Sequence, residues 1–167
     1  KLTIRVPVIP TFNDTEDEID AIAEYAASRG VRTCSENHGM LAQDSDRMER
    51  LFNAVAHENY GLLVDMGNFL CVDESPVTAV SRLAPYAIHV HAKDFLPCAD
   101  GGIETRGANH IRGTVIGEGI VPVRQCLAIL RKAGYDGYVT VEYEGAEPCI
   151  EGIRRGLAHL RGFAAGL

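Results

Sequence analysis

The sequence predicts an α/β fold built on a parallel sheet. Four short apolar segments turn polar at their C-terminal ends, which is typical of parallel strands that are buried on both faces. Strands and helices are expected to alternate strictly, and this alternation indicates a parallel sheet with right-handed crossovers. The four polar ends are, in order, Glu36, Asp65, His91 and Glu142. Because the chemistry of a β/α barrel collects at such strand ends, we expect a partial TIM-type (β/α) barrel.

Five strands are expected along the chain. The first is an extended, β-branched run, and its two prolines suit a strand end. The other four are the apolar runs that end in the polar residues named above. Together they cover residues 2–10, 31–36, 61–65, 86–91 and 138–142.

Five helices alternate with these strands. The first follows three potential N-caps, Asn13, Asp14 and Thr15, and the first two carry apolar residues at helical spacing. The third and fourth begin at Ser75-Pro76 and Val121-Pro122, because proline in the first helical turn loses no hydrogen bond. The helices cover residues 16–28, 44–57, a segment that begins at residue 75, then 121–134 and 147–163.

The longest stretch without regular structure is expected at residues 95–119, directly after the strand that ends at His91. Loops of this length in a compact domain are usually functional or mobile, and we interpret this one as a substrate-covering loop, with simple flexibility as the alternative. No linker divides the chain, so residues 1–167 are expected to form a single (β/α) barrel-type domain. A complete barrel usually needs about 250 residues, so this one is expected to be incomplete at its N-terminus.

The four polar strand ends predict one divalent-metal site. An acid at a strand end is often only a helix cap, and Asp65 alone would be interpreted as a cap or turn residue. Four such residues on successive strands favour a metal site instead, with Glu36, Asp65, His91 and Glu142 as ligands. Three carboxylates and one imidazole suit a hard or borderline ion, Mn²⁺, Mg²⁺, Co²⁺ or Zn²⁺, and we favour Mn²⁺.

Other polar residues lie on the same faces of these strands, because residues two apart point the same way. His89 is expected to be a deeper, hydrogen-bonded core histidine, and Glu144 is expected to lie beyond its strand in solvent. His38 and Lys93 are candidates for substrate contact, with surface or supporting roles as the alternative.

Composition excludes several classes of partner. A net charge of −7 argues against a surface that relies on phosphate contacts, so we predict no nucleic-acid partner. No apolar run approaches the roughly 20 residues that a membrane-spanning helix needs. The five cysteines contain no CxxC pair, so neither a zinc knuckle nor an obvious disulfide framework is indicated. We therefore predict a reduced, cytoplasmic protein with a small-molecule partner and no membrane partner.

Five motifs together resemble a known family. ENHG, DMGN, HVHAKD, GEGIVPV and AGYDGYVTVEYEG, in this order, resemble the C-terminal half of sugar isomerases and epimerases of the xylose-isomerase-like TIM-barrel superfamily, over about residues 30–167. The resemblance implies that the five units correspond to the fourth to eighth of an eight-fold barrel. It also implies that the four predicted residues are its metal ligands and that Glu36 and Glu142 are the catalytic acid/base pair, on opposite sides of a bound sugar.

The same resemblance suggests substrate-binding residues. Asn68 falls where related enzymes place a substrate-contacting polar residue. The family's substrate-binding arginine has no counterpart at Pro97, six residues beyond His91, so Arg106 or Arg112 is the candidate replacement.

The first thirty residues resemble a different family. The segment IRVPVIPTFNDTEDEIDAIAEYA resembles a strand–helix unit of glycyl-radical-activating enzymes of the radical-SAM class. No CxxxCxxC motif occurs, so no iron–sulfur chemistry is implied. Both families use β/α barrels, and this segment can therefore serve as the fourth unit; chance convergence, gene fusion and a chimera all remain open.

These observations predict a metal-dependent sugar isomerase or ketose epimerase that transfers a proton through an enediolate. One alternative is an endonuclease-IV-like enzyme that acts at apurinic sites, and another is a catalytically idle barrel fragment. The open edges of a partial barrel also predict a homo-oligomer, another covering chain or a missing N-terminal barrel segment. The sequence leaves open which sugar is used and whether it is phosphorylated.

Overall fold

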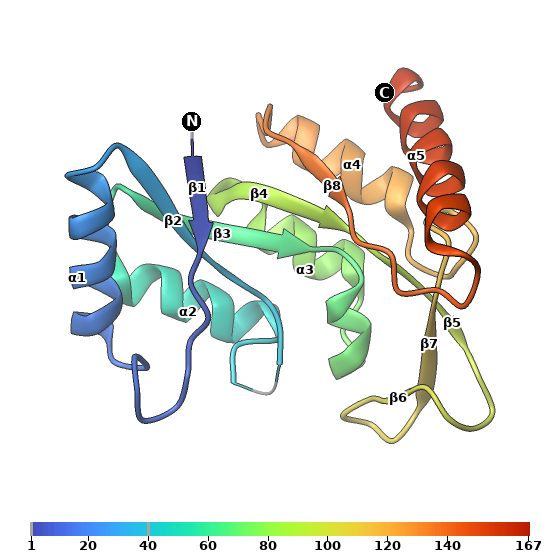
Figure 1. The fold of residues 1–167 in the computed structure, drawn as a ribbon, viewed down its shortest axis with the longest axis horizontal. Helices are drawn as coiled ribbons and strands as arrows, with labels where there is room; N and C mark the ends of the chain where they lie inside the picture. Colours follow the sequence, from blue (N-terminus) through green and yellow to red (C-terminus); the bar gives the residue numbers. More distant parts are fainter. Residues whose placement is uncertain (1, 40) are drawn as a thin grey trace.

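A computed structural model describes residues 2–39 and 41–167 of the chain. Its centre is a sheet of five parallel strands in the order β1-β2-β3-β4-β8 (Figure 1). This confirms the predicted α/β fold and gives half of a TIM-type barrel. The strands are β1 (Leu2–Arg5), β2 (Val31–Glu36), β3 (Tyr60–Asp65), β4 (Ala87–Ala92) and β8 (Val139–Val141).

The helices follow the strands in the predicted order, and consecutive helices pack against one another around the sheet. A capping box between Thr15 and Glu18 begins the first helix, and the Asp44 side chain caps the second. The α-helices are α1 (Glu16–Ala27), α2 (Ser45–Val55), α3 (Pro76–Leu83), α4 (Val123–Lys132) and α5 (Cys149–Ala165). Two short 3₁₀ helices, η1 (Asn68–Val72) and η2 (Ala84–Tyr86), precede and follow α3.

The two faces of the sheet have different surroundings. Leu62, Val64 and Val90 are fully buried in the hydrophobic core, as expected for strands covered by helices. On the opposite face, which would be the interior of a closed barrel, side chains such as Cys34, Leu63 and His89 surround a hollow of about 410 Å³. The core therefore fills one side of the sheet and leaves the barrel interior open.

The prediction of an irregular loop at residues 95–119 is wrong. This region instead contains a second, antiparallel sheet in the order β5-β7-β6, formed by β5 (Asp94–Pro97), β6 (Ile103–Glu104) and β7 (His110–Thr114). We call residues 94–114 the arm, and Figure 1 shows it extending away from the main sheet. After the arm, Val115 and Ile116 are fully buried, so the chain returns directly into the core.

The arm is fixed to η1 by one aspartate. The Asp73 carboxylate accepts hydrogen bonds from Thr105 Oγ1 at 2.8 Å, Gly107 N at 2.6 Å and Asn109 Nδ2 at 2.8 Å. The Arg106 N–H donates to the Cys71 carbonyl at 2.9 Å. These contacts hold the turn of the arm in place, and the covering of a substrate by this segment stays a prediction.

The first strand is shorter than predicted. It ends at Arg5 rather than at residue 10, after which the Val6 N–H makes one more bond to the Cys34 carbonyl at 2.8 Å. Pro7 and Pro10 have no N–H to donate, so the ladder cannot continue through them.

β1 and β8 are the outer strands of the main sheet, as predicted for a half-barrel. Leu2 and Ile4 of β1 are 60% and 48% exposed, and Tyr138, next to β8, is 82% exposed. Among the described residues, no helix combines the length and apolar character required to cross a bilayer.

We predict that this 167-residue chain, studied alone, self-associates through these edges. Unpaired strand edges that carry apolar side chains readily pair with another chain. Light scattering should show dimers or larger species, and Ile4→Lys should shift the population toward monomer. Tyr25→Lys, at an exposed position of α1, serves as the control and should leave the size distribution unchanged. A monodisperse wild-type monomer at high concentration would contradict the prediction.

Candidate metal centre

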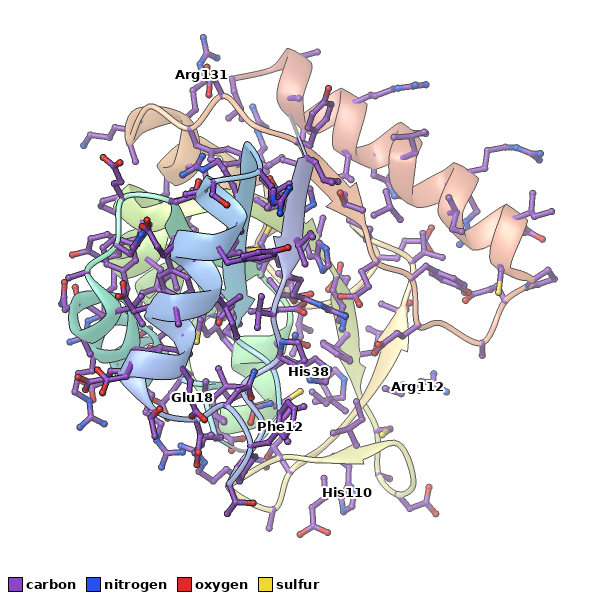
Figure 2. All side chains as sticks on the ribbon, turned by 60° about the vertical axis from the view of Figure 1, so that its left-hand side comes forward. Phe12, Glu18, His38, His110, Arg112 and Arg131 are labelled. Carbon is purple, nitrogen blue, oxygen red and sulfur yellow. The ribbon has the colours of Figure 1, made fainter. Side chains whose placement is uncertain are left out.

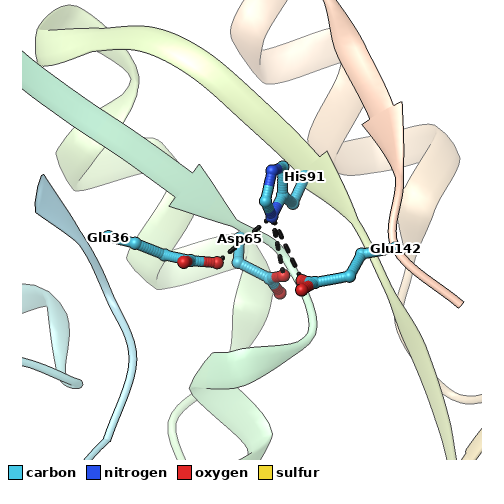
Figure 3. A group of neighbouring side chains, drawn as sticks. All are labelled: Glu36, Asp65, His91 and Glu142. Carbon is cyan, nitrogen blue, oxygen red and sulfur yellow. Dashed lines mark hydrogen bonds and ion pairs between the residues drawn. The ribbon is translucent and has the colours of Figure 1, made fainter. Parts of the chain in front are cut away.

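The register of the sheet brings the four predicted ligands together at one end. Asp65 lies opposite His91 in the β3–β4 pair, and Glu36 lies opposite Leu63 in the β2–β3 pair. Leu63 and Asp65 are two residues apart and share a face, so Glu36 points toward the same side. One potential ligand atom from each of Glu36, Asp65, His91 and Glu142 lies within 4.8 Å of all the others (Figure 3).

His91 is at the centre of this group. Its Nδ1 is 3.1 Å from Glu36 Oε1, 3.1 Å from Glu142 Oε2 and 3.8 Å from Asp65 Oδ2. Figure 3 shows Glu36 and Glu142 approaching the imidazole from opposite sides, with Asp65 between them. The two glutamates therefore face each other across the imidazole of His91.

Asp65 is held by hydrogen bonds from the turn that follows it and from the segment after β2. Its Oδ1 accepts hydrogen bonds from Gly67 N at 2.8 Å and Asn68 N at 2.9 Å, so the carboxylate does cap the turn. The Asn37 side chain pairs with the Asp65 backbone, accepting from its N–H at 2.7 Å and donating to its carbonyl at 3.0 Å. The second carboxylate oxygen stays directed at His91. The cap and ligand interpretations of Asp65 are therefore compatible.

The charges of the group shift its protonation equilibria. Burial lowers the pKa of His91, but its close contacts with Glu142 and Glu36 and the negative charges of both carboxylates raise it to about 9. The hydrogen bond from His91, together with contacts to Lys93, lowers the pKa of Glu142. Burial, and to a smaller extent the hydrogen bond and charge of Glu142, raise the pKa of Asp65. Without a metal ion, the protein thus keeps protons in this cluster that a divalent cation would replace.

The residues present fit a divalent ion. Glu36 Oε1 and Asp65 Oδ2 are buried and face His91 Nδ1 at 3.1 and 3.8 Å, but no described residue donates a well-aligned hydrogen bond to either oxygen. Buried polar atoms without partners are rare and call for an explanation such as an ion. Three carboxylates and one imidazole form a donor set that suits Mg²⁺, Mn²⁺, Co²⁺ or Zn²⁺.

Lys93 joins this centre to further polar residues. Its side chain is almost completely buried, and Nζ lies 3.0 Å from Glu142 Oε2, 3.1 Å from Glu144 Oε1 and 3.2 Å from Asn68 Oδ1. Burial lowers the pKa of Lys93, but the charge of Asp65 and contacts with the glutamates raise it well above its ordinary value. Glu144 lies beyond β8 and is exposed, as expected, and its carboxylate also pairs with Lys93, a contact that the sequence did not predict.

The other predicted residues lie at different distances from the centre. His38 (labelled in Figure 2) is exposed and lines two cavities, one with Glu36 and Glu142 and the other with Asn68 and Lys93. Arg112 is exposed on β7 and is directed away from the body of the protein, whereas Arg106 lines the cavity that also contains Lys93. His89 is half-buried and lies 2.9 Å from Thr140 Oγ1, as expected for a hydrogen-bonded histidine.

The contribution of Arg5 to this centre was not predicted from the sequence. This residue of β1 forms an ion pair with Oε2 of Glu36, and its side chain is half exposed. It lines a cavity of about 650 Å³ together with Glu36 and Glu142. The first strand therefore contributes a charged group to the centre. The only signal in the sequence was an arginine that alternates with the apolar residues of a predicted strand.

A family model described as "Xylose isomerase-like TIM barrel" matches residues 10–163. The match includes α1, which the sequence alone likened to radical-SAM activating enzymes. An inosose dehydratase of Yersinia enterocolitica is 27% identical over 156 residues, covering 84% of this chain and 52% of its own length. An inosose dehydratase of Klebsiella pneumoniae is also 27% identical, over 150 residues, with 81% and 50% coverage. The chain thus spans about half the length of the curated relatives it matches.

Solved structures share the fold. A xylose isomerase-like TIM barrel protein from Mycobacterium smegmatis, in complex with magnesium, has a TM-score of 0.77 at 16% identity, covering 98% of this chain and 61% of its own. The IOLI protein with a bound zinc atom has a TM-score of 0.75 at 16% identity, with 99% and 63% coverage. A 3-keto-D-glucoside 4-epimerase from E. coli has a TM-score of 0.68 at 18% identity, with 95% and 63% coverage.

We predict that Asp65→Asn lowers the affinity for Mn²⁺ by at least about tenfold. The amide oxygen can still accept the hydrogen bonds from Gly67 and Asn68, so the turn is preserved while the charged ligand is lost. Titration against a fluorescent chelator measures the affinity, and circular dichroism verifies the fold. His89→Gln should bind like the wild type, because His89 lies on the same inner face but outside the cluster. Equal Mn²⁺ affinity in wild type and Asp65→Asn would contradict the assignment of Asp65 as a ligand.

Proposed function

The chain belongs to the xylose isomerase-like TIM barrel family, and from this membership we propose that it contains the catalytic half of a metal-dependent sugar isomerase or ketose epimerase. The observation that carries the proposal is the convergence of Glu36, Asp65, His91 and Glu142 at the C-terminal ends of neighbouring strands. In TIM barrels this end of the sheet is where active sites lie. The four residues would hold the ion and leave Glu36 and Glu142 on opposite sides of the substrate.

The chemistry requires removal of a proton from carbon next to a carbonyl group. A divalent ion held here would supply Lewis-acid stabilisation of the negative charge that develops on the substrate oxygens. One glutamate would remove the proton as general base. The other would return it to the neighbouring carbon, or to the opposite face of the same carbon, and the product is then the isomer or the epimer. His91 and Lys93 would keep the two carboxylates ionised and in position.

A dehydratase is the second candidate, and the relatives at 27% identity favour it because both are inosose dehydratases. Both reactions begin with the same proton removal and pass through an enediolate-type species. They differ in the next step, since an epimerase returns a proton to carbon whereas a dehydratase expels a hydroxyl group from the adjacent carbon. The same pair of carboxylates would serve the first step of either reaction.

Two further properties of the centre belong to the proposal. Mn²⁺ is our favoured ion, and the magnesium and zinc in related structures support a divalent ion of this kind. The substrate is a sugar or a similar polyhydroxylated ketone, with His38, Asn68, Lys93 and one arm arginine, Arg106 or Arg112, as its contacts. The chain spans about half the length of its relatives. The proposal therefore includes a second half-barrel, from another polypeptide or a further segment, as a requirement for full activity.

We predict that Glu142→Gln lowers the rate of proton exchange between solvent and the substrate carbon by about 100-fold or more, which is the contribution typical of general acid–base catalysis. The amide keeps one oxygen for the metal but cannot take up a proton. Proton NMR in D₂O, with D-fructose and an inosose as substrates and Mn²⁺ present, measures both the exchange and any loss of water.

Glu36→Gln should have a similar effect if the two glutamates act as a pair. Glu58→Gln, at an exposed glutamate that precedes β3, is the matched control and should exchange at the wild-type rate. If Glu142→Gln exchanges as fast as an active wild type, another group moves the proton. If the wild type itself releases water from the inosose, the dehydratase candidate replaces the epimerase.

A further inference from the structure

A second cavity lies next to the metal centre, and we call it the arm cavity. Its volume is about 580 Å³, which is within the range of small-molecule sites. Besides His38, Gly39, Gln43, Arg47 and Cys71, its lining contains residues that surround the centre and residues of the arm. These are Asn68, Lys93 and Glu144 on the side of the sheet, and Glu104, Thr105 and Arg106 on the arm. Lys93 touches both Glu142 of the centre and Glu144 of the cavity, so the two spaces share a wall.

One buried hydrogen-bond donor on this wall has no partner. Asn68 is only 3% exposed, and its Oδ1 accepts from Lys93 Nζ at 3.2 Å. Its Nδ2 makes no hydrogen bond to any described residue. A buried amide without a partner is costly, and here it borders a cavity large enough for a ligand. A ligand oxygen that accepts a hydrogen bond would satisfy it.

The lysine and the two arginines that line the cavity already form ion pairs. Lys93 lies between the carboxylates of Glu142 and Glu144, and Arg106 is 3.1 Å from Asp44 Oδ2. Arg47, which also lines the cavity, is 3.3 Å from the same Asp44 oxygen.

Glu104 and Glu144 add two carboxylates to the lining. A phosphate dianion would have to break existing ion pairs and approach these acids, whereas phosphate sites usually offer available cations or helix N-termini. Hydroxyl groups both donate and accept, so they can bond to the amide of Asn68 and to the acids.

The arm side of the cavity is held in place before any ligand arrives. Asp73 fixes the turn that carries Thr105 and Arg106 through three hydrogen bonds. A side chain at Gly113 would collide with the backbone of Glu144, so glycine lets the arm pack closely against the segment after β8. A wall fixed in this way loses little conformational entropy when a ligand binds.

We propose that the arm cavity binds the non-reacting, hydroxylated part of an uncharged polyol and that it discriminates against the phosphorylated form of the same molecule. The inference rests on the proposed function, because it assigns the substrate class of that site. Asn68 Nδ2 donates to a hydroxyl oxygen, and Glu104 and Glu144 accept from hydroxyl groups. The arm thereby determines which substrate reaches the metal centre.

The test compares D-fructose with D-fructose 6-phosphate, which differ only by the phosphate group. Saturation-transfer NMR on the full chain with Mg²⁺ measures binding independently of turnover. D-fructose should bind at least about tenfold more tightly than its phosphate. Asn68→Ala should weaken D-fructose binding about fivefold, the effect of one lost hydrogen bond. Ile103→Trp, which enlarges a partly exposed lining residue without touching the metal centre, should weaken it at least as much.

Matched controls are available for both variants. Asn53→Ala on α2 and Ile150→Trp on α5 change exposed residues of the same types and should leave binding unchanged. Equal or tighter binding of the phosphate, an unchanged affinity in Ile103→Trp, or no binding of D-fructose would overturn the inference. Selective binding of D-fructose without any proton exchange would support the inference and count against the proposed reaction, so the two failures are distinguishable.

Discussion

The strongest constraint on this protein is the crowding of like charges at one end of its sheet. Glu36 and Asp65 are buried, Glu142 is half-buried, and all three carboxylates point at His91. Removing several charges from water is unfavourable unless they are paired and hydrogen-bonded. Lys93 and the imidazolium of His91 offset part of this charge, and a divalent ion would offset the remainder. Every other part of the site depends on this balance.

Backbone and side-chain contacts around the centre keep these charges in register. Asn37 joins β2 to β3 by bonding to both backbone groups of Asp65. At the base of the arm, the buried Asp94 carboxylate accepts four backbone hydrogen bonds, each 2.9 Å long. The donors are the N–H groups of Phe95, Gly117, Gly119 and Val121. The start of the arm and the segment before α4 are therefore fixed to each other. Strand ends, arm and helix are positioned together, so the cluster is not assembled only when a ligand binds.

The sequence was sufficient to predict the main sheet because burial and chemistry leave a local signal in each strand. The predicted second strand, residues 31–36, agrees with β2, and the turn from apolar to polar residues located Asp65 and His91 correctly. The arm left no such signal. Its strands are short and interrupted by glycines, and its position depends on Asp73, which is more than thirty residues away in the chain. Side-chain hydrogen bonds at such separations produce no periodicity.

The same reasoning explains the two contacts around the metal centre that were not predicted from the sequence. Arg5 meets Glu36 across 31 residues, and Glu144 meets Lys93 across 51. Predicting either contact requires the register between two strands, whereas predicting a strand requires only one segment. A general consequence follows for a barrel of this kind. The residues that determine the reaction lie at strand ends, where sequence patterns are strongest, and those that determine the substrate lie where only long-range contacts place them. The reaction class can therefore be inferred from such a sequence before the substrate can.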